Sequence, residues 1–88
     1  MRYILFGIHW ELIPEKIAEA MKLYEGDNVV FPEGLEVVEE YVWGNQSLEI
    51  VKADNMGPVI NYILQFTPFV RNFKIKALVT LRELLSKL

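Results

Sequence analysis

The stretch NMGPVINYILQFTPFV, residues 55–70, contains no charged residue in a chain of 88 residues. A membrane-spanning helix needs about 20 consecutive apolar residues. This stretch is shorter, and it contains two prolines together with Asn61 and Gln65. We therefore expect it to form a helix of the protein core and not a membrane span.

The helix has recognisable start and stop signals. Asp54 or Asn55 can cap its first turn, and Pro58 fits that turn because the amide hydrogen it lacks would be unused there. The Thr67-Pro68 step ends it, since the residue before a proline avoids the α conformation. The apolar arc is expected to hold Val59, Ile60, Ile63, Leu64 and Phe66, with Asn61, Tyr62 and Gln65 towards the other side.

The flanking segments predict four strands and two more helices. Residues 2–10, 35–43, 47–53 and 72–80 have the β-branched, aromatic or alternating composition of strands. A helix is expected from Pro14 to about residue 25, ended by Gly26 in a left-handed C-cap. Thr80 and Glu83 form a capping box that predicts a tail helix to Leu88.

The order β-α-β-β-α-β plus a C-terminal helix predicts one domain, residues 1–88, with an α+β, ferredoxin-like fold. Both helices would cover one face of an antiparallel sheet, and Ile4, Phe6 and Ile8 would point to them. The opposite face would be too apolar to stay wet in a monomer, which predicts that a second copy covers it. Its expected residues are Tyr3, Leu5, Gly7, His9, Leu35, Val37, Glu39, Tyr41 and Trp43.

Three segments resemble the small uncharacterised proteins of the dimeric α/β-barrel superfamily. They are HWELIPEK, PEGLEVVEEYVWG and VKADNMGPVINYILQFTPFVRNFKI, and together the resemblance spans nearly the whole chain. It implies a homodimer whose two sheets meet to form a barrel. Relatives of that fold include cofactor-independent monooxygenases, haem-handling enzymes and many proteins of unknown role. The stretch KIKALVTLRELLSKL departs from the family pattern by continuing into a basic, helical tail.

Composition narrows the classes of function. The net charge of −3 disfavours nucleic acid, which requires a concentrated basic surface. With no cysteine and one histidine, disulfides and zinc sites of the Cys/His type are excluded, and we expect no metal and no cofactor. No small-residue cleavage site follows the apolar N-terminal segment, so a strand is favoured over a signal peptide and a cytoplasmic location is expected.

His9 is the single candidate for catalysis. Histidine changes its charge near neutral pH and can act as a general base. The alternative is a hydrogen-bonded structural histidine in the dimer interface.

Tyr3, Glu39, Tyr41 and Trp43 are the candidate ligand-binding residues. A carboxylate beside aromatic rings can line a small-molecule pocket. The alternative is an interface strip in which Glu39 pairs with Lys74 or Lys76 across the dimer. The two lysines could bind an anion, or they could protect an edge strand from aggregation.

The leading hypothesis is a homodimer, or a higher oligomer, that binds or transforms a small apolar or aromatic molecule in an interface cavity. The alternative is a non-catalytic structural or regulatory module that presents its helices to another protein. RNA binding is a third hypothesis, because ILFGIHW is loosely similar to the first strand of RNA-recognition folds. The segment QSLEIVKA, however, lacks the expected basic and aromatic pattern.

Overall fold

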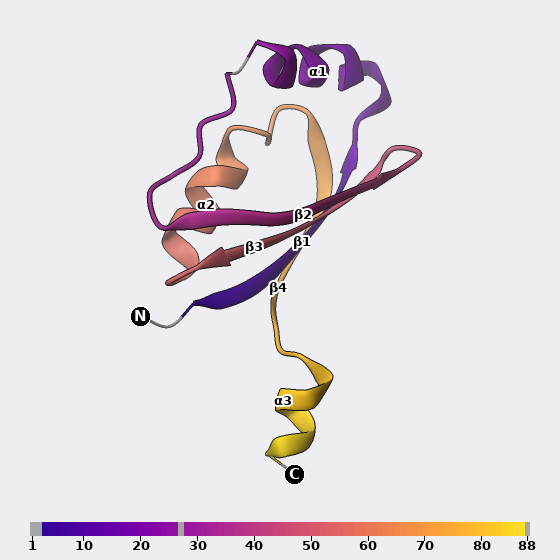
Figure 1. Ribbon diagram of the computed structural model, residues 1–88. Coiled ribbons are helices and arrows are strands. Elements are labelled where there is room, and N and C mark those ends of the chain that lie inside the picture. Colours follow the sequence, from indigo (N-terminus) through magenta and orange to yellow (C-terminus); the bar gives the residue numbers. More distant parts are fainter. Residues whose placement is uncertain (1–2, 27, 88) are drawn as a thin grey trace.

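The structure is a computed structural model that describes residues 3–26 and 28–87. In this part of the chain, four strands form one open antiparallel sheet and three α-helices accompany it (Figure 1). The elements are β1 (Ile4–Leu12), a 3₁₀ turn (Pro14–Lys16), α1 (Ile17–Glu25), β2 (Leu35–Trp43), β3 (Gln46–Ala53), α2 (Met56–Leu64), β4 (Val70–Leu78) and α3 (Leu81–Ser86).

The strands lie in the order β2-β3-β1-β4, and each neighbouring pair is antiparallel. The two central strands, β1 and β3, therefore come from the two halves of the chain. This arrangement confirms the predicted α+β class and is consistent with a ferredoxin-like fold. Because β1 is central, residues in its middle have a strand on either side.

Most element limits agree with the sequence within two or three residues, and two of the predicted helix caps are present. Asn55 caps α2 by accepting a hydrogen bond from the Gly57 amide at 2.8 Å, and Thr80 caps α3 by accepting from the Glu83 amide at 3.1 Å. Gly26 ends α1 at φ −87°, so the expected left-handed cap is wrong. The ends of the first strand and the tail helix, predicted at residues 2 and 88, lie outside the described residues.

The core lies between the sheet and α2. Phe6 and Ile8 of β1 are buried there, as predicted, against Val51 of β3 and Val59 of α2. The helix α1 lies beyond one end of this layer (Figure 1) and contributes Leu23 to the packing. Aromatic rings close that end, with Trp10 packed on Phe66 at 5.3 Å, Tyr24 on Phe66 at 5.8 Å and Tyr62 on Phe66 at 5.2 Å between centroids.

The expected orientation of α2 is wrong in one respect. Tyr62 is fully buried, whereas Ile60 and Leu64 are 47% and 57% exposed. The buried stripe runs through Val59, Tyr62, Ile63 and Phe66, which is the i, i+3, i+4, i+7 pattern of one helix face. Tyr62 can occupy this stripe because its hydroxyl group has a buried hydrogen-bond acceptor. No helix in the described ranges is long and apolar enough to cross a membrane.

A β-bulge on β2 makes the predicted set of open-face residues wrong in part. Val37 lies opposite Val51 and Glu39 lies opposite Ile50, so Val38 is an extra residue on β2. An extra residue exchanges the faces to which the following side chains point. Leu35 and Val37 therefore pack against the core, contrary to expectation. Glu39, Tyr41 and Trp43 share the open face with His9, as their register with β3 and β1 requires.

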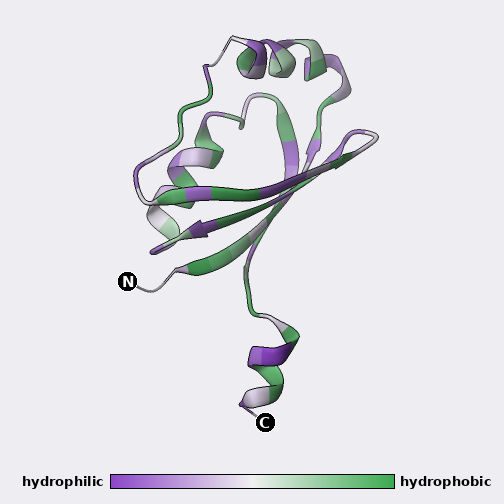
Figure 2. Cartoon of the chain, in the orientation of Figure 1, coloured by the Kyte–Doolittle hydropathy of each residue, from purple (hydrophilic) through white to green (hydrophobic). Residues whose placement is uncertain are grey.

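The C-terminal helix α3 projects away from the rest of the chain (Figure 1). Strand β4 ends at Leu78 instead of the expected Thr80, and the chain leaves the sheet there. Leu81 is 70% exposed, and Leu84 and Leu85 are exposed as well. Figure 2 shows apolar and polar residues alternating along α3.

Candidate functional site

The candidate site lies on the open face of the sheet around His9. This residue belongs to the central strand β1, with Leu48 of β3 opposite on one side and Lys74 of β4 opposite on the other. Three strands thus fix its position and its neighbours. A side chain in the middle of a sheet is held more rigidly than one on a loop, which suits a residue that must meet a ligand in a defined geometry.

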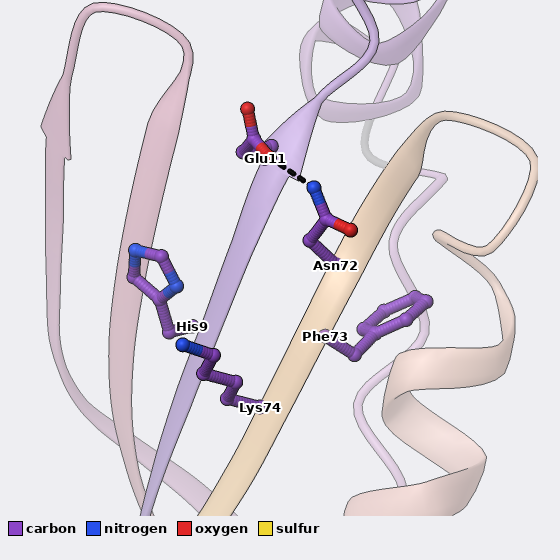
Figure 3. Close-up of a pocket in the computed structure, with 5 residues that line it drawn as sticks. All are labelled: His9, Glu11, Asn72, Phe73 and Lys74. Atoms are coloured by element: carbon purple, nitrogen blue, oxygen red, sulfur yellow. Dashed lines mark hydrogen bonds between the residues drawn. The ribbon is translucent and has the colours of Figure 1, made fainter.

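A surface pocket of about 460 Å³ opens beside His9. Its lining residues are His9, Glu11, Asn72, Phe73 and Lys74 (Figure 3). The side chains of His9 and Lys74 lie on the same side of the sheet in this view. Phe73 points to the other side of β4, where the centroid of its ring lies 6.2 Å from that of Trp10, with the two rings nearly perpendicular.

A second β-bulge shapes this pocket. His9 pairs with Lys74 and Glu11 pairs with Arg71, so β4 has one more residue than β1 between these two pairs. Asn72 lies in the bulge at φ 56°, the left-handed region that asparagine tolerates better than most residues. The bulge turns the Asn72 side chain towards Glu11, and bulges of this kind are frequent next to functional sites.

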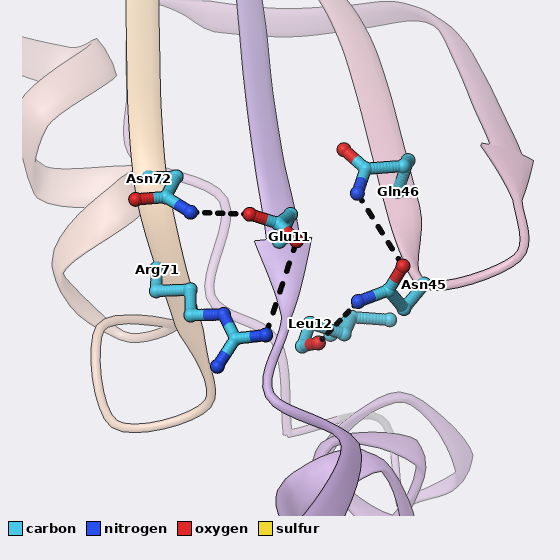
Figure 4. A network of polar contacts seen from close by, with 6 residues as sticks. All are labelled: Glu11, Leu12, Asn45, Gln46, Arg71 and Asn72. Atoms are coloured by element: carbon cyan, nitrogen blue, oxygen red, sulfur yellow. Dashed lines mark hydrogen bonds and ion pairs between the residues drawn. The ribbon is translucent and has the colours of Figure 1, made fainter.

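The Glu11 carboxylate is held by neighbours on β4 (Figure 4). The Asn72 side-chain amide donates a hydrogen bond to its Oε2, and Arg71 Nη2 lies 3.9 Å from its Oε1. The hydrogen bond from Asn72 is the main influence that lowers the pKa of Glu11, and the charge of Arg71 adds to it. Glu11 is therefore a carboxylate at neutral pH, and both of its oxygens are engaged away from His9.

The turn between β2 and β3 is tied to the end of β1. Asn45 Nδ2 donates to the Leu12 carbonyl at 3.2 Å, and the Leu12 amide donates to the Asn45 carbonyl at 2.7 Å. Gln46 Nε2 in turn donates to Asn45 Oδ1 at 3.3 Å (Figure 4). These bonds fix β2 relative to β1, and with it the aromatic residues that β2 carries to the open face.

Aromatic side chains of β2 form the other wall of the site. The Trp43 ring lies 6.0 Å from the His9 ring, with 38° between their planes. Trp43 is 57% exposed and Tyr41 is 49% exposed, so about half of the surface of each residue is free to contact a ligand or a second chain. A flat molecule above His9 would thus have Trp43 on one side and Lys74 on the other.

The structure does not bring all the predicted site residues together. Tyr3 lies six residues from His9 along the strand direction, a separation of about 20 Å in extended chain. It lines a different pocket of about 500 Å³ with Glu33, Gly34, Asp54, Asn55 and Pro58. Glu39 does share the open face, but its register through Ile50 places it level with Gly7 and not with His9, whereas Tyr41 is level with His9 through Leu48. His9, Tyr41 and Trp43 form the compact part of the predicted set.

A buried acidic residue on the helix-covered face was missing from the predicted site residues. Glu49 is 1% exposed, and the Tyr62 hydroxyl donates to its Oε1 at 3.0 Å. Burial, and then the neighbouring Glu40 carboxyl, raise the pKa of Glu49 to about 8. Its Oε2 has no hydrogen-bond donor among the described residues unless one of the two carboxyls is protonated. The sequence could have indicated this burial, because Glu49 lies at two-residue spacing from Val51 and Ala53 and therefore on the same, core-facing side of β3.

The geometry supports three chemical tasks on the open face. A histidine can take or give a proton, a lysine can bind an anionic group, and a tryptophan ring can stack on a flat molecule. Within the described residues, no three His, Asp or Glu side chains are grouped closely enough to hold a metal ion. Comparisons of the chain with models of protein families, with curated proteins and with solved structures gave no match.

Proposed function

We propose that two copies of this chain pair through their open sheet faces to form a dimeric α/β barrel that binds a small aromatic or apolar molecule between the sheets. His9 would lie inside that cavity, where it can act as an acid or base if the molecule is transformed. The observation that carries the proposal is the contact on the open face between the half-buried His9 of the central strand β1 and the exposed Trp43 at the end of the edge strand β2.

The contrast in burial supports the pairing. The described part of the chain covers one sheet face with α2, whereas the other face carries Tyr41 and Trp43 about half exposed. Contiguous exposed apolar surface with a polar rim is typical of protein interfaces, and exposed aromatic residues are enriched there. A second copy presents the same surface, so a twofold pairing covers both faces at once.

The polar residues on this face support a ligand cavity over a fully packed interface. His9, Lys74 and Lys76 would all enter the region between the sheets. Buried titratable side chains need partners, because an unpaired charge or donor in an apolar interior is costly. A bound molecule that supplies those partners accounts for residues that a purely structural interface would not require.

The two tryptophans provide the test. Protein labelled with ¹⁵N would be titrated with 2-naphthamide, a neutral aromatic probe, while the indole N–H signals are followed by NMR. We expect the Trp43 signal to shift, because its ring faces the cavity, and the buried Trp10 signal to stay in place as the internal control. The substitution His9→Ala should weaken the shift while the mass of the dimer is unchanged. Absence of any Trp43 shift, or an identical titration of the His9→Ala protein, would contradict the proposed function.

The alternative function is a protein-interaction module, and one observation favours it. Met56, Ile60 and Leu64 form an exposed apolar stripe at four-residue spacing along the outer side of α2. This stripe and the exposed leucines of α3 could join dimers into larger assemblies or bind another protein. Light scattering separates the two functions: assemblies larger than a dimer that Ile60→Lys dissolves, together with no binding of the probe, would favour the module.

A further inference from the structure

We propose that the ligand of the open face is an aromatic carboxylate, whose anionic group binds Lys74 and Lys76 while its ring lies against Trp43. This inference rests on the proposed function, because it identifies the class of molecule that the cavity would accept. It is carried by the positions of charged groups across the four strands.

The register places both lysines beside the centre of the face. Lys74 lies opposite His9, and Lys76 lies opposite Gly7, two residues earlier on β1. Residues at two-residue spacing on a strand point to the same side of the sheet. The two ammonium groups therefore belong to the open face, on the side of His9 that is away from Trp43.

Neither lysine has an acidic partner in the described part of the chain. The ion pairs found there join Lys16 to Glu19 and Arg71 to Glu11. Glu11 lines the same pocket as Lys74, but Asn72 and Arg71 hold its two oxygens. The remaining lysine of this face, Lys52, lies opposite Glu36 and so has an acidic neighbour. The uncompensated positive charge is thus concentrated on β4.

Glu39 is too far away to neutralise this charge within one chain. It lies on β2, and the sheet order places β3 and β1 between it and β4. Three strand spacings correspond to about 14 Å, which exceeds the distance of about 8 Å over which exposed charges interact at physiological salt. Covering the face would leave Lys74 and Lys76 without counter-charges unless an anion or the partner chain supplies them.

The arrangement of the site suits a carboxylate attached to a ring. Trp43 and Lys74 lie on opposite sides of His9, so a ligand over the histidine contacts an aromatic plane at one end and ammonium groups at the other. A charge-assisted hydrogen bond from lysine to carboxylate is stronger than a neutral one. A carboxylate attached to an aromatic ring therefore matches both ends of the site.

The experiment compares two probes of the same shape, 2-naphthoate and 2-naphthamide, by calorimetric titration of the dimer. The naphthoate should bind about tenfold more tightly, as expected for one or two charge-assisted hydrogen bonds. The double substitution Lys74→Gln, Lys76→Gln should abolish this preference and leave naphthamide binding unchanged. Glutamine keeps these positions polar, so that the edge strand does not become prone to aggregation.

A matched control removes two positive charges elsewhere. Lys16→Gln with Lys22→Gln changes the net charge equally on the 3₁₀ turn and α1, away from the open face, and it should retain the preference for naphthoate. Equal affinities for the two probes, or a preference that survives the β4 substitutions, would overturn this inference while leaving the proposed function intact. Failure of both probes to bind would overturn the two together. Loss of dimerisation in the β4 double variant would show that the lysines pair with Glu39 of the second copy, which also contradicts the inference.

Discussion

The two faces of the sheet are built from the same strands, but one is buried and the other is largely exposed. On the face covered by α2, Ile8 and Val51 are fully buried. On the opposite face, Tyr41 and Trp43 of the same sheet remain about half exposed beside His9 and Lys74. The difference shows that the chain forms one complete core by itself. The opposite face carries a second layer of apolar and polar side chains, and no element among the described residues covers it.

The largest expected effect on stability comes from a substitution in the core on the face that α2 covers. Ile8→Ala removes a fully buried side chain from the centre of the core. We expect the free energy of unfolding to fall by about 2–5 kcal/mol, measured by urea denaturation. Val42→Ala is the control, because Val42 is largely exposed, and it should change stability by no more than about 0.5 kcal/mol. Similar losses in both variants would show that the covered face is not the dominant core.

The next effect comes from the open face. Trp43→Lys places a charge where we propose that two sheets meet, and it should weaken the dimer by about 2 kcal/mol or more, or roughly thirtyfold in Kd. Sedimentation velocity over a range of concentrations measures this. Val42→Lys is the matched control, since Val42 is the neighbouring residue and its position opposite Ser47 directs it to the other face. Dissociation caused equally by both lysines would argue against a specific role for the open face.

The burial of Glu49 on the covered face predicts how the stability of the protein depends on pH. Burial, and then the neighbouring Glu40, raise the pKa of Glu49 from 4.5 to about 8 in the folded chain. The folded state therefore binds more protons than the unfolded state between these values, so the free energy of unfolding should fall as pH rises from about 4.5 to about 8. Glu49→Gln should flatten this part of the profile and make the protein more stable than the unsubstituted chain at the alkaline end.

Thermal unfolding across this pH range provides the measurement. The control is Glu19→Gln, which removes an exposed carboxylate on α1 and should leave the slope in place. A slope that persists in the Glu49→Gln protein would assign it to other groups.

The smallest expected effect lies at the bulge beside the site. Asn72→Ala loses the hydrogen bond to Glu11 and leaves a β-carbon-bearing residue without a compensating side chain at φ 56°. A cost of about 1–2 kcal/mol is expected from these two changes. Asn72→Gly relieves the backbone part and should recover some of that stability, although the hydrogen bond is still lost. If alanine and glycine are equally tolerated, the left-handed backbone at this position is not maintained in solution.

The sequence predicted the covered face better than the open one, for a physical reason. Alternation identified the side of β1 on which Phe6 and Ile8 pack against α2, although Ile4 at the start of the strand is 40% exposed, and the caps at Asn55 and Thr80 located two helix starts. The bulge at Val38 could not be foreseen, because an inserted residue leaves no mark in the composition of a strand, and so Leu35 and Val37 were placed on the wrong face.

The candidate site was predictable in part. His9 and Trp43 were both expected on the open face, and the structure brings their rings to 6.0 Å. Tyr3 was grouped with them by strand parity alone, which ignores distance along the strand. The predicted orientation of α2 was wrong because Tyr62 was assigned to the polar side of the helix, whereas it is buried with its hydroxyl group bonded to Glu49. A pairing of this kind depends on contacts between distant segments, which local patterns do not encode.

The most direct test of the central claim is the mass of the purified chain in solution, measured by sedimentation from micromolar to millimolar concentration and combined with the solvent accessibility of the Trp43 indole. We predict a species of twice the 10.3 kDa chain mass, with Trp43 protected from a water-soluble quencher. A stable 10.3 kDa species at every concentration, with Trp43 fully quenched, would contradict the pairing of the open faces and every role proposed for the residues on them.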